Sequence, residues 1–452
     1  APGAPIAPTL PQPVVATLAN GLRVVTVERH ELPLVTASLV SLGGAATDPV
    51  GKAGASSLSA DLMTKGTTTR SATEIARAVE SLGGSITAGA SDDGATIDLT
   101  VPSAQADTAM TILADVATHP AFAQAEIDRA RTQAIDSLNV AMKNPAQLSA
   151  MVADRVVYGA RAYGQPLSGT PASLKALTRA DLTAAYARNW KPGQATLLFV
   201  GDVTPAQARA LAERHLGSWR VAGAAAAAVK AAEPAFPAPR VIVVDMPDAG
   251  QAGVVVARSG IRRADDRYYP LAVANTVLGG GFSSRLNQEI RIKRGLAYGA
   301  GSAVQAGRDI GMISARTQTK NPSAAEVVGL IDAEMTKLGT APVPQDELAT
   351  RQAVLIGGFG RTIETTDGIA DILANYTLQG VPLDELSRYI PRVQAVDSAA
   401  VQSASAALLD PKAASIIVVG DAKQFLPALK AQHLDVEVIP AAEVDLDTPK
   451  LR

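Results

Sequence analysis

The residues best placed to do chemistry in this sequence are Arg291 and Tyr298, in the segment GGGFSSRLNQEIRIKRGLAYGAGSAV (279–304). The pattern predicts a helix over 283–293 that ends before Gly295, and Tyr298 begins the strand that follows. An arginine in the last helical turn and a tyrosine at a strand start can point to one side. There they would offer a guanidinium fork and a phenol donor to a peptide backbone or an oxyanion. A structural role fits too, with Arg291 next to the helix dipole and Tyr298 on an amphipathic strand.

Three consecutive glycines, Gly279, Gly280 and Gly281, precede this helix. Backbone amides at a helix start can bind an anion, so the glycine loop is a candidate substrate-binding element. The loop follows a predicted helix over 267–278 rather than a strand, which argues against a dinucleotide-binding fold. A flexible connector between two helices is the alternative interpretation.

The usual catalytic side chains are sparse. The chain has no cysteine, which excludes disulfides, thiolate zinc sites and a cysteine nucleophile. No two of its four histidines are spaced i, i+4, so no helix offers two imidazoles to a zinc ion. No G-x-S-x-G nucleophile elbow is present either. The histidines are His30, His119, His215 and His433.

The segment GKAGASSLSADLMTKGT (51–67) combines a helical pattern with an unusual polar set. Leu58 and Leu62 lie four residues apart, as on one helix face, and the pattern stops at Lys65-Gly66. A lone carboxylate, Asp61, lies among small polar residues after a glycine-rich turn. The spacing raises the question of whether this is a catalytic helix or a former one.

Length and composition define the elements that must position these residues. A chain of 452 residues is too long for one ordinary core, so two or more domains are expected. Lys+Arg 41 against Asp+Glu 43 argues against nucleic acid as a partner, and no apolar run approaches the roughly 20 residues of a membrane span. The opening APGAPIAP fits a chain trimmed after a secretory signal, which predicts a periplasmic location, with a cytoplasmic one as the alternative.

Two halves of the chain resemble each other. Pro192 matches Pro411 and Gly201-Asp202 matches Gly420-Asp421, each pair 219 residues apart. Strands that pair through hairpins, with the helices segregated, make each half α+β. We therefore predict two tandem homologous α/β sandwiches, each with a mixed or antiparallel sheet and helices packed on one side. The predicted parts are an extended tail (1–13), a first half (14–220), an Ala/Pro-rich linker (221–240) and a second half (241–452).

Several motifs together resemble the insulinase/pitrilysin-like zinc peptidases, a family that includes the mitochondrial processing peptidase and the core proteins of the cytochrome bc1 complex. The motifs are ANGLRVV near the start, GKAG…KGT, YGQPLSGTPASLKALTRADL, NWKPGQATLLFVGD and, most specific, GGGFSSRLNQEIRIKRGLAY. The likeness covers nearly the whole chain. It implies tandem α+β halves that form a clamshell around a chamber for peptides.

Active members of that family carry an inverted zinc motif, H-x-x-E-H, on the helix before K-G-T, and a downstream Glu completes the metal site. Here the two histidine positions hold Ser57 and Asp61, and the position of the glutamate base holds Ala60. The downstream Glu falls near Asp136 or Ser137. A hydroxyl and carboxylates cannot replace two imidazoles for zinc, so we expect neither metal nor cofactor in this chain.

The Arg/Tyr pair of the family is kept as Arg291 and Tyr298. The likeness implies that Arg291 holds the peptide backbone and that Tyr298 donates a hydrogen bond to the scissile carbonyl oxygen. The resemblance implies a non-zinc subunit of a heterodimeric peptidase whose homologous partner supplies H-x-x-E-H and zinc. The heterodimer would cleave small or unfolded peptides, and this chain alone would be inactive. The alternatives are a structural homologue like the respiratory core proteins and a homodimeric peptide-binding protein.

Overall fold

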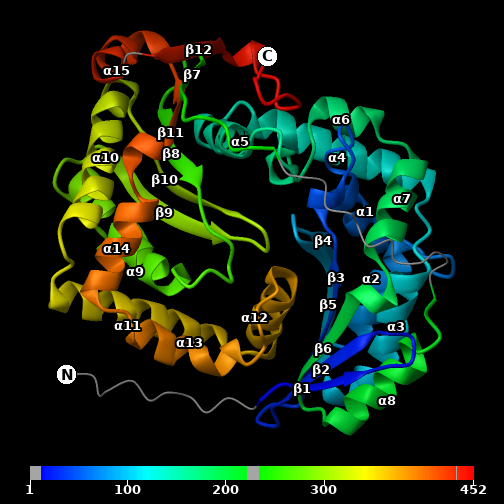
Figure 1. The fold of residues 1–452 in the computed structure, drawn as a ribbon. Helices are drawn as coiled ribbons and strands as arrows, with labels where there is room; N and C mark the ends of the chain where they lie inside the picture. The colour runs from blue at the N-terminus through cyan, green and yellow to red at the C-terminus, as the bar shows by residue number, and fades with distance from the viewer. Residues whose placement is uncertain (1–11, 221–233, 434) are drawn as a thin grey trace. The chain divides into compact units, whose positions relative to one another are not determined.

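Two six-stranded sheets form the framework of the chain (Figure 1). The computed structural model describes residues 12–220, 234–433 and 435–452. The first sheet has the order β1-β2-β6-β3-β5-β4, with β1 (Val14–Thr17), β2 (Arg23–Glu28), β3 (Leu34–Leu42), β4 (Ser85–Ala90), β5 (Gly94–Pro102) and β6 (Ala195–Gly201). The second has the order β12-β7-β11-β8-β10-β9, with β7 (Val241–Asp245), β8 (Ala252–Ser259), β9 (Ala297–Ala306), β10 (Gly311–Thr319), β11 (Ser415–Gly420) and β12 (Val436–Pro440).

The two sheets repeat one topology, as the duplicated sequence predicts. In each, one inner pair is parallel, β2 with β6 and β7 with β11, and the next three pairs are antiparallel. Only the outermost strand on one side differs. β1 comes before β2 and runs antiparallel to it, whereas β12 comes from the chain's end and runs parallel to β7. The mixed sheet of each predicted half is confirmed.

The helices begin where the sequence supplies caps. Several of the helices begin with a capping box, in which the side chain of each residue accepts a hydrogen bond from the backbone N–H of the other. Examples are Ser71 with Glu74, Thr178 with Asp181 and Thr204 with Gln207. The helices are α1 (Ala55–Met63), α2 (Ala72–Ser81), α3 (Ala106–Thr118), α4 (Gln124–Ala141), α5 (Pro145–Tyr158), α6 (Pro171–Ala176), α7 (Arg179–Asn189), α8 (Pro205–Leu216), α9 (Tyr268–Leu278), α10 (Ala324–Thr340), α11 (Gln345–Thr362), α12 (Thr366–Gln379), α13 (Glu385–Gln394), α14 (Ser398–Leu408) and α15 (Leu426–Gln432).

Helices cover both faces of the first sheet. Because side chains alternate along a strand, Leu39 on β3 and Ile97 on β5 lie on one face, in a core shared with α3 and α8. On the other face, Thr36 of β3 donates a hydrogen bond to the carboxylate of Asp367, at the start of α12. The fold class is as predicted, but the cover is two-sided rather than one-sided. The additional helix comes from the C-terminal half of the sequence.

The second sheet receives a helix from the N-terminal half in the same way. α5 packs on β8 and β11, and its Val152 and Val156 share a core with Val255 and Ile417. α10 packs on β8 as well. The hydrophobic pattern of α5 predicts a buried face, and the structure shows that this face is buried against the sheet of the other sequence half.

The compact units therefore exchange segments between the sequence halves. Among the described residues, the first unit comprises 12–135, 167–220 and 358–390, and the second comprises 136–166, 234–357 and 391–452 without 434. The predicted tail (1–13) and linker (221–240) fall mostly outside the described residues. Within the described parts of the chain, no helix is both long enough and apolar enough to cross a membrane.

Candidate functional site

The three zinc-motif positions lie on α1 and have three different environments. Ser57 is half-buried, Ala60 is 1% exposed within the hydrophobic core, and the Asp61 side chain is half exposed. The Asp61 carboxylate lies 3.6 Å from the ammonium of Lys65, which follows the C-cap of the helix. A hydroxyl, a buried methyl group and a paired carboxylate do not form a metal-binding set, so these residues do not fit a zinc ion.

The other polar groups of α1 hold the helix in place. The buried carboxylate of Asp48 accepts hydrogen bonds from the Ser56 backbone N–H at 3.0 Å and from the Ser56 hydroxyl at 2.6 Å. Arg188 donates to the same carboxylate at 2.8 Å, and the Ser59 hydroxyl donates to the Leu182 carbonyl. Burial raises the pKa of the Asp48 carboxyl. The serines of this helix therefore anchor it to the turn before it and to α7.

The glycine loop of the second unit connects α9 closely to β9. The N–H groups of Gly279 and Gly280 both donate to the Asn275 carbonyl at 2.9 Å, and the Gly279 carbonyl accepts from the Ser302 N–H at 3.2 Å. A Cβ on Gly279 would lie 2.2 Å from the Ser302 nitrogen, so only glycine fits there. Two of the three loop amides are thus engaged within the fold, whereas a Cβ on Gly281 would meet open space.

The helix after the loop is not a regular α-helix. Residues Asn287–Ile292 form a π-helical turn, and the Lys293 N–H reaches back to the Gln288 carbonyl at 2.9 Å. Asn287 fixes the turn, because its amide nitrogen donates to the Gly281 carbonyl and its amide oxygen accepts from the Ala300 N–H, both at 3.0 Å. Single π turns of this kind occur often at functional sites. This one carries Arg291.

Arg291 differs from the other cations of its segment in having no charged partner. Arg285 forms a two-pronged ion pair with Glu347, and Lys293 and Arg294 both bond to Glu289. The Arg291 guanidinium makes no hydrogen bond or ion pair within the described parts of the chain. It lies over the ring of Phe282, with its central carbon 4.5 Å from the ring centroid. A cation–π contact of this kind orients the guanidinium and leaves its N–H groups available.

Tyr298 is the most exposed large aromatic side chain of the segment. It is the second residue of β9 and is 92% exposed, and Phe282 is 65% exposed. Its hydroxyl makes no hydrogen bond to any residue that the structure describes. Arg291 and Tyr298 thus both present free donors on the second unit, and the two side chains can bind a ligand without breaking an internal bond.

Both sequence halves match a known family of peptidases. Residues 23–170 match the family described as insulinase (peptidase family M16), and residues 176–355 match the peptidase M16 inactive domain. The chain belongs to the M16 peptidase family. The family predicted from the motifs is therefore confirmed.

The M16 relatives are distant in sequence but similar over most of their length. An uncharacterized zinc protease of Mycobacterium leprae is 27% identical over 346 residues, 76% of this chain and 77% of the relative. The crystal structure of an M16 inactive domain from Pseudomonas fluorescens has a TM-score of 0.83 at 25% identity, covering 90% of this chain and 98% of that one. A chain of complex III2 from Candida albicans has a TM-score of 0.75 at 14% identity, covering 91% and 97%, which shows likeness of fold alone.

The downstream position of the M16 zinc motif adds no ligand. Asp136 and Ser137 lie on α4, and both are exposed. Across the described residues, no group of three or more histidine, aspartate or glutamate side chains is arranged to hold a metal ion. Three of the four histidines lie beside carboxylates and far from one another in sequence: His30 is 2.7 Å from Asp202, His119 is 3.6 Å from Asp115, and His215 is 2.8 Å from Asp107.

Sequence reasoning did not identify Arg351, which supports this site from α11. Its side chain is 6% exposed, and its guanidinium donates to the Ser283 hydroxyl at 3.0 Å and to the Ser283 carbonyl at 2.6 Å. Glu347, one turn earlier on α11, holds Arg285. The spacing of Glu347 and Arg351 shows that they share a helix face, but nothing in the sequence indicates that the face meets a loop some 68 residues away. Phe282 and Asn287 were not predicted either.

Proposed function

We propose that this chain is the non-zinc subunit of a heterodimeric M16 metallopeptidase. The observation that carries the proposal is the state of Arg291 and Tyr298. Every other cation between Arg285 and Arg294 has a carboxylate partner within its own unit, whereas these two side chains have unused donors. A fold that keeps such groups unpaired and accessible supports a role with a ligand or a partner chain.

In the proposed complex, the homologous partner supplies H-x-x-E-H and the zinc ion that makes water reactive. Tyr298 donates its phenol hydrogen to the scissile carbonyl oxygen as negative charge develops on it. Arg291, held over Phe282, donates to carbonyl groups of the bound peptide. Small or unfolded peptides are the proposed substrates, and Gly281 is the loop residue open to them.

The direct test is purification of the full chain alone and together with a homologous partner that contains an intact H-x-x-E-H. We expect the chain alone to contain no stoichiometric zinc by metal analysis and to cleave no peptide, and the mixture to form a stable heterodimer that cleaves short peptides. Zinc bound tightly by the isolated chain, or peptidase activity without the partner, would overturn the proposal.

A second candidate is a structural subunit without peptidase activity. The emptied zinc motif on α1 fits that role equally well, because the core residues around Ala60 are kept although the chemistry is lost. Co-purification separates the two candidates. A zinc-loaded peptidase partner supports the first, and a larger membrane assembly without peptidase activity supports the second.

A further inference from the structure

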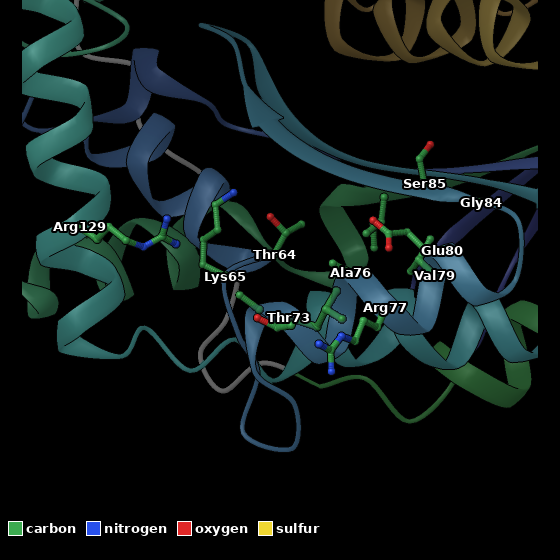
Figure 2. A pocket seen from close by; sticks show the side chains of 13 residues that line it. Thr64, Lys65, Thr73, Ala76, Arg77, Val79, Glu80, Gly84, Ser85 and Arg129 are labelled. Atoms are coloured by element: carbon green, nitrogen blue, oxygen red, sulfur yellow. The ribbon is translucent and has the colours of Figure 1, made fainter.

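A groove of about 660 Å³ lies in the first unit, beside the end of α1 and along α2, and reaches the start of the edge strand β4 (Figure 2). Its volume is within the range of ligand-binding clefts. Ala72, Ala76 and Ile86 provide the accessible apolar lining, whereas Ile75 and Val79 behind them are 1% exposed and belong to the core of the unit. Figure 2 shows Lys65 and Arg129 toward one end of the groove and Glu80 and Ser85 toward the other. None of these residues belongs to the Arg291 site.

The charged groups that line the groove are mostly cationic. Lys65, Arg77 and Arg129 contribute three positive charges, and Glu80 is the single carboxylate among the lining residues. Lys65 and Arg129 have carboxylate partners outside the lining, Asp61 at 3.6 Å and Glu126. Arg77 is exposed and, within the described residues, forms no hydrogen bond or ion pair. The groove therefore has an unpaired guanidinium next to an apolar floor.

We propose that this groove binds peptide segments in which an apolar residue is flanked by carboxylates. The apolar side chain would contact Ala76 and Ile86, and a neighbouring carboxylate would accept a two-pronged pair of hydrogen bonds from Arg77. Lys65 and Arg129 would add attraction that falls with ionic strength. The inference rests on the proposed function, from which it takes the ligand to be a peptide. It assigns to the first unit a preference for acidic peptides.

The test is fluorescence anisotropy of the full chain alone with three labelled peptides of equal length at low and high salt. One contains glutamates beside a leucine and has an amidated C-terminus. The second is neutral with a free C-terminal carboxylate, and the third replaces the glutamates by lysines. We expect the glutamate peptide to bind most tightly, and its affinity to fall as salt is added. Stronger binding of the second peptide would show that the groove recognises the C-terminal carboxylate of a peptide rather than glutamate side chains.

Opposite changes on one helix face make the test specific. Arg77→Ala should weaken binding of the glutamate peptide about three-fold and Arg77→Glu about ten-fold, as expected for a partly exposed charge pair and its reversal. Glu80→Gln, one turn away, should tighten binding about two-fold because it removes a repelling carboxylate. Arg209→Ala on α8, an exposed cation away from the groove, is the matched control and should change nothing.

Equal affinity of the three peptides, or wild-type binding by both Arg77 variants, would overturn the inference. If the Arg77 variants fold poorly, the tightening expected for Glu80→Gln still decides the question, because a folding defect cannot raise affinity. The assay needs neither partner nor zinc. Its failure would therefore leave the roles of Arg291 and Tyr298 untouched, and an inactive heterodimer would leave the groove result standing.

Discussion

The two units of this chain use their polar side chains in opposite ways. On α1, Ser56 is bonded to Asp48, Ser59 is bonded to the Leu182 carbonyl, and Asp61 is paired with Lys65. On the segment that carries Arg291 and Tyr298, the fold pairs every neighbouring charge but leaves these two donors free. The difference teaches that the first unit uses the polar groups of α1 to hold the fold, whereas the second presents donors that the fold does not use and that remain open to solvent or a ligand.

The strongest test of this contrast removes the free donors. In the reconstituted heterodimer, Tyr298→Phe should lower kcat about 10²-fold, because one hydrogen-bond donor to the developing oxyanion is lost. Arg291→Ala should mainly raise KM, because it removes a contact made to the bound peptide before and during the reaction. Steady-state peptide hydrolysis and zinc content of each complex are the measurements, and zinc content should not change.

Lys293→Ala is the matched control for these variants. Lys293 lies two residues from Arg291, but Glu289 already neutralises it, so its removal should leave kcat and KM unchanged. Full activity of both Tyr298→Phe and Arg291→Ala would show that the unpaired donors have no catalytic use. The contrast between the units would then be structural only.

The next test asks whether the former site can still accept its catalytic group. Ala60 is 1% exposed in the core of the first unit, so Ala60→Glu places a carboxylate among apolar neighbours. We expect a loss of about 3 kcal/mol in the free energy of unfolding, measured with urea. Asp61→His is the control, because Asp61 is exposed and loses only a weak pair, at a cost below about 0.5 kcal/mol. Equal stability of both variants would mean that α1 has kept room for the base.

Asp48 tests the claim that the polar groups of α1 serve the fold. Asp48→Ala leaves the Ser56 N–H and Arg188 without this acceptor and should cost about 2 kcal/mol of stability. Burial raises the pKa of Asp48, so its ionisation-linked contribution is full below the unfolded pKa and is lost as pH rises through the raised value. Asp48→Asn should remove that slope in urea titrations across pH, and an unchanged slope would exclude Asp48 as its source.

Local patterns predicted a helix and a strand around Arg291 and Tyr298 and proposed these two residues as candidates for the site. The helix that ends at a glycine and the strand start that follows it indicated Arg291 and Tyr298. A helix over 283–293 was expected to be regular, and its π-helical turn was not anticipated. An i, i+5 hydrogen bond such as that of Lys293 leaves no compositional signal, because it depends on how Asn287 bridges the glycine loop and β9.

The sequence could not predict which distant segments pack against one another. The apolar faces of α5 and α12 predict burial but do not specify a sheet, and each helix packs on the sheet of the other sequence half. The contact between Arg351 and Ser283 also joins distant segments. The periodicity of apolar residues indicates which face of a helix is buried. Which sheet that face packs against depends on the tertiary arrangement.

The smallest expected effect concerns Glu289, which pairs with Lys293 and Arg294 and not with Arg291. Hydrogen bonds from Lys293 and then Arg294 hold the pKa of Glu289 below its ordinary value of 4.5. A lowered pKa contributes stability that is present above that ordinary value and is lost as pH falls through the folded-state pKa. Glu289→Gln should therefore be about 0.5 kcal/mol less stable than wild type at neutral pH, and the difference should vanish in acid. Urea unfolding of both proteins at neutral pH and at about pH 3 measures this. A difference that persists in acid would show that Glu289 acts through packing, and that Arg291 is not set apart by charge pairing around it.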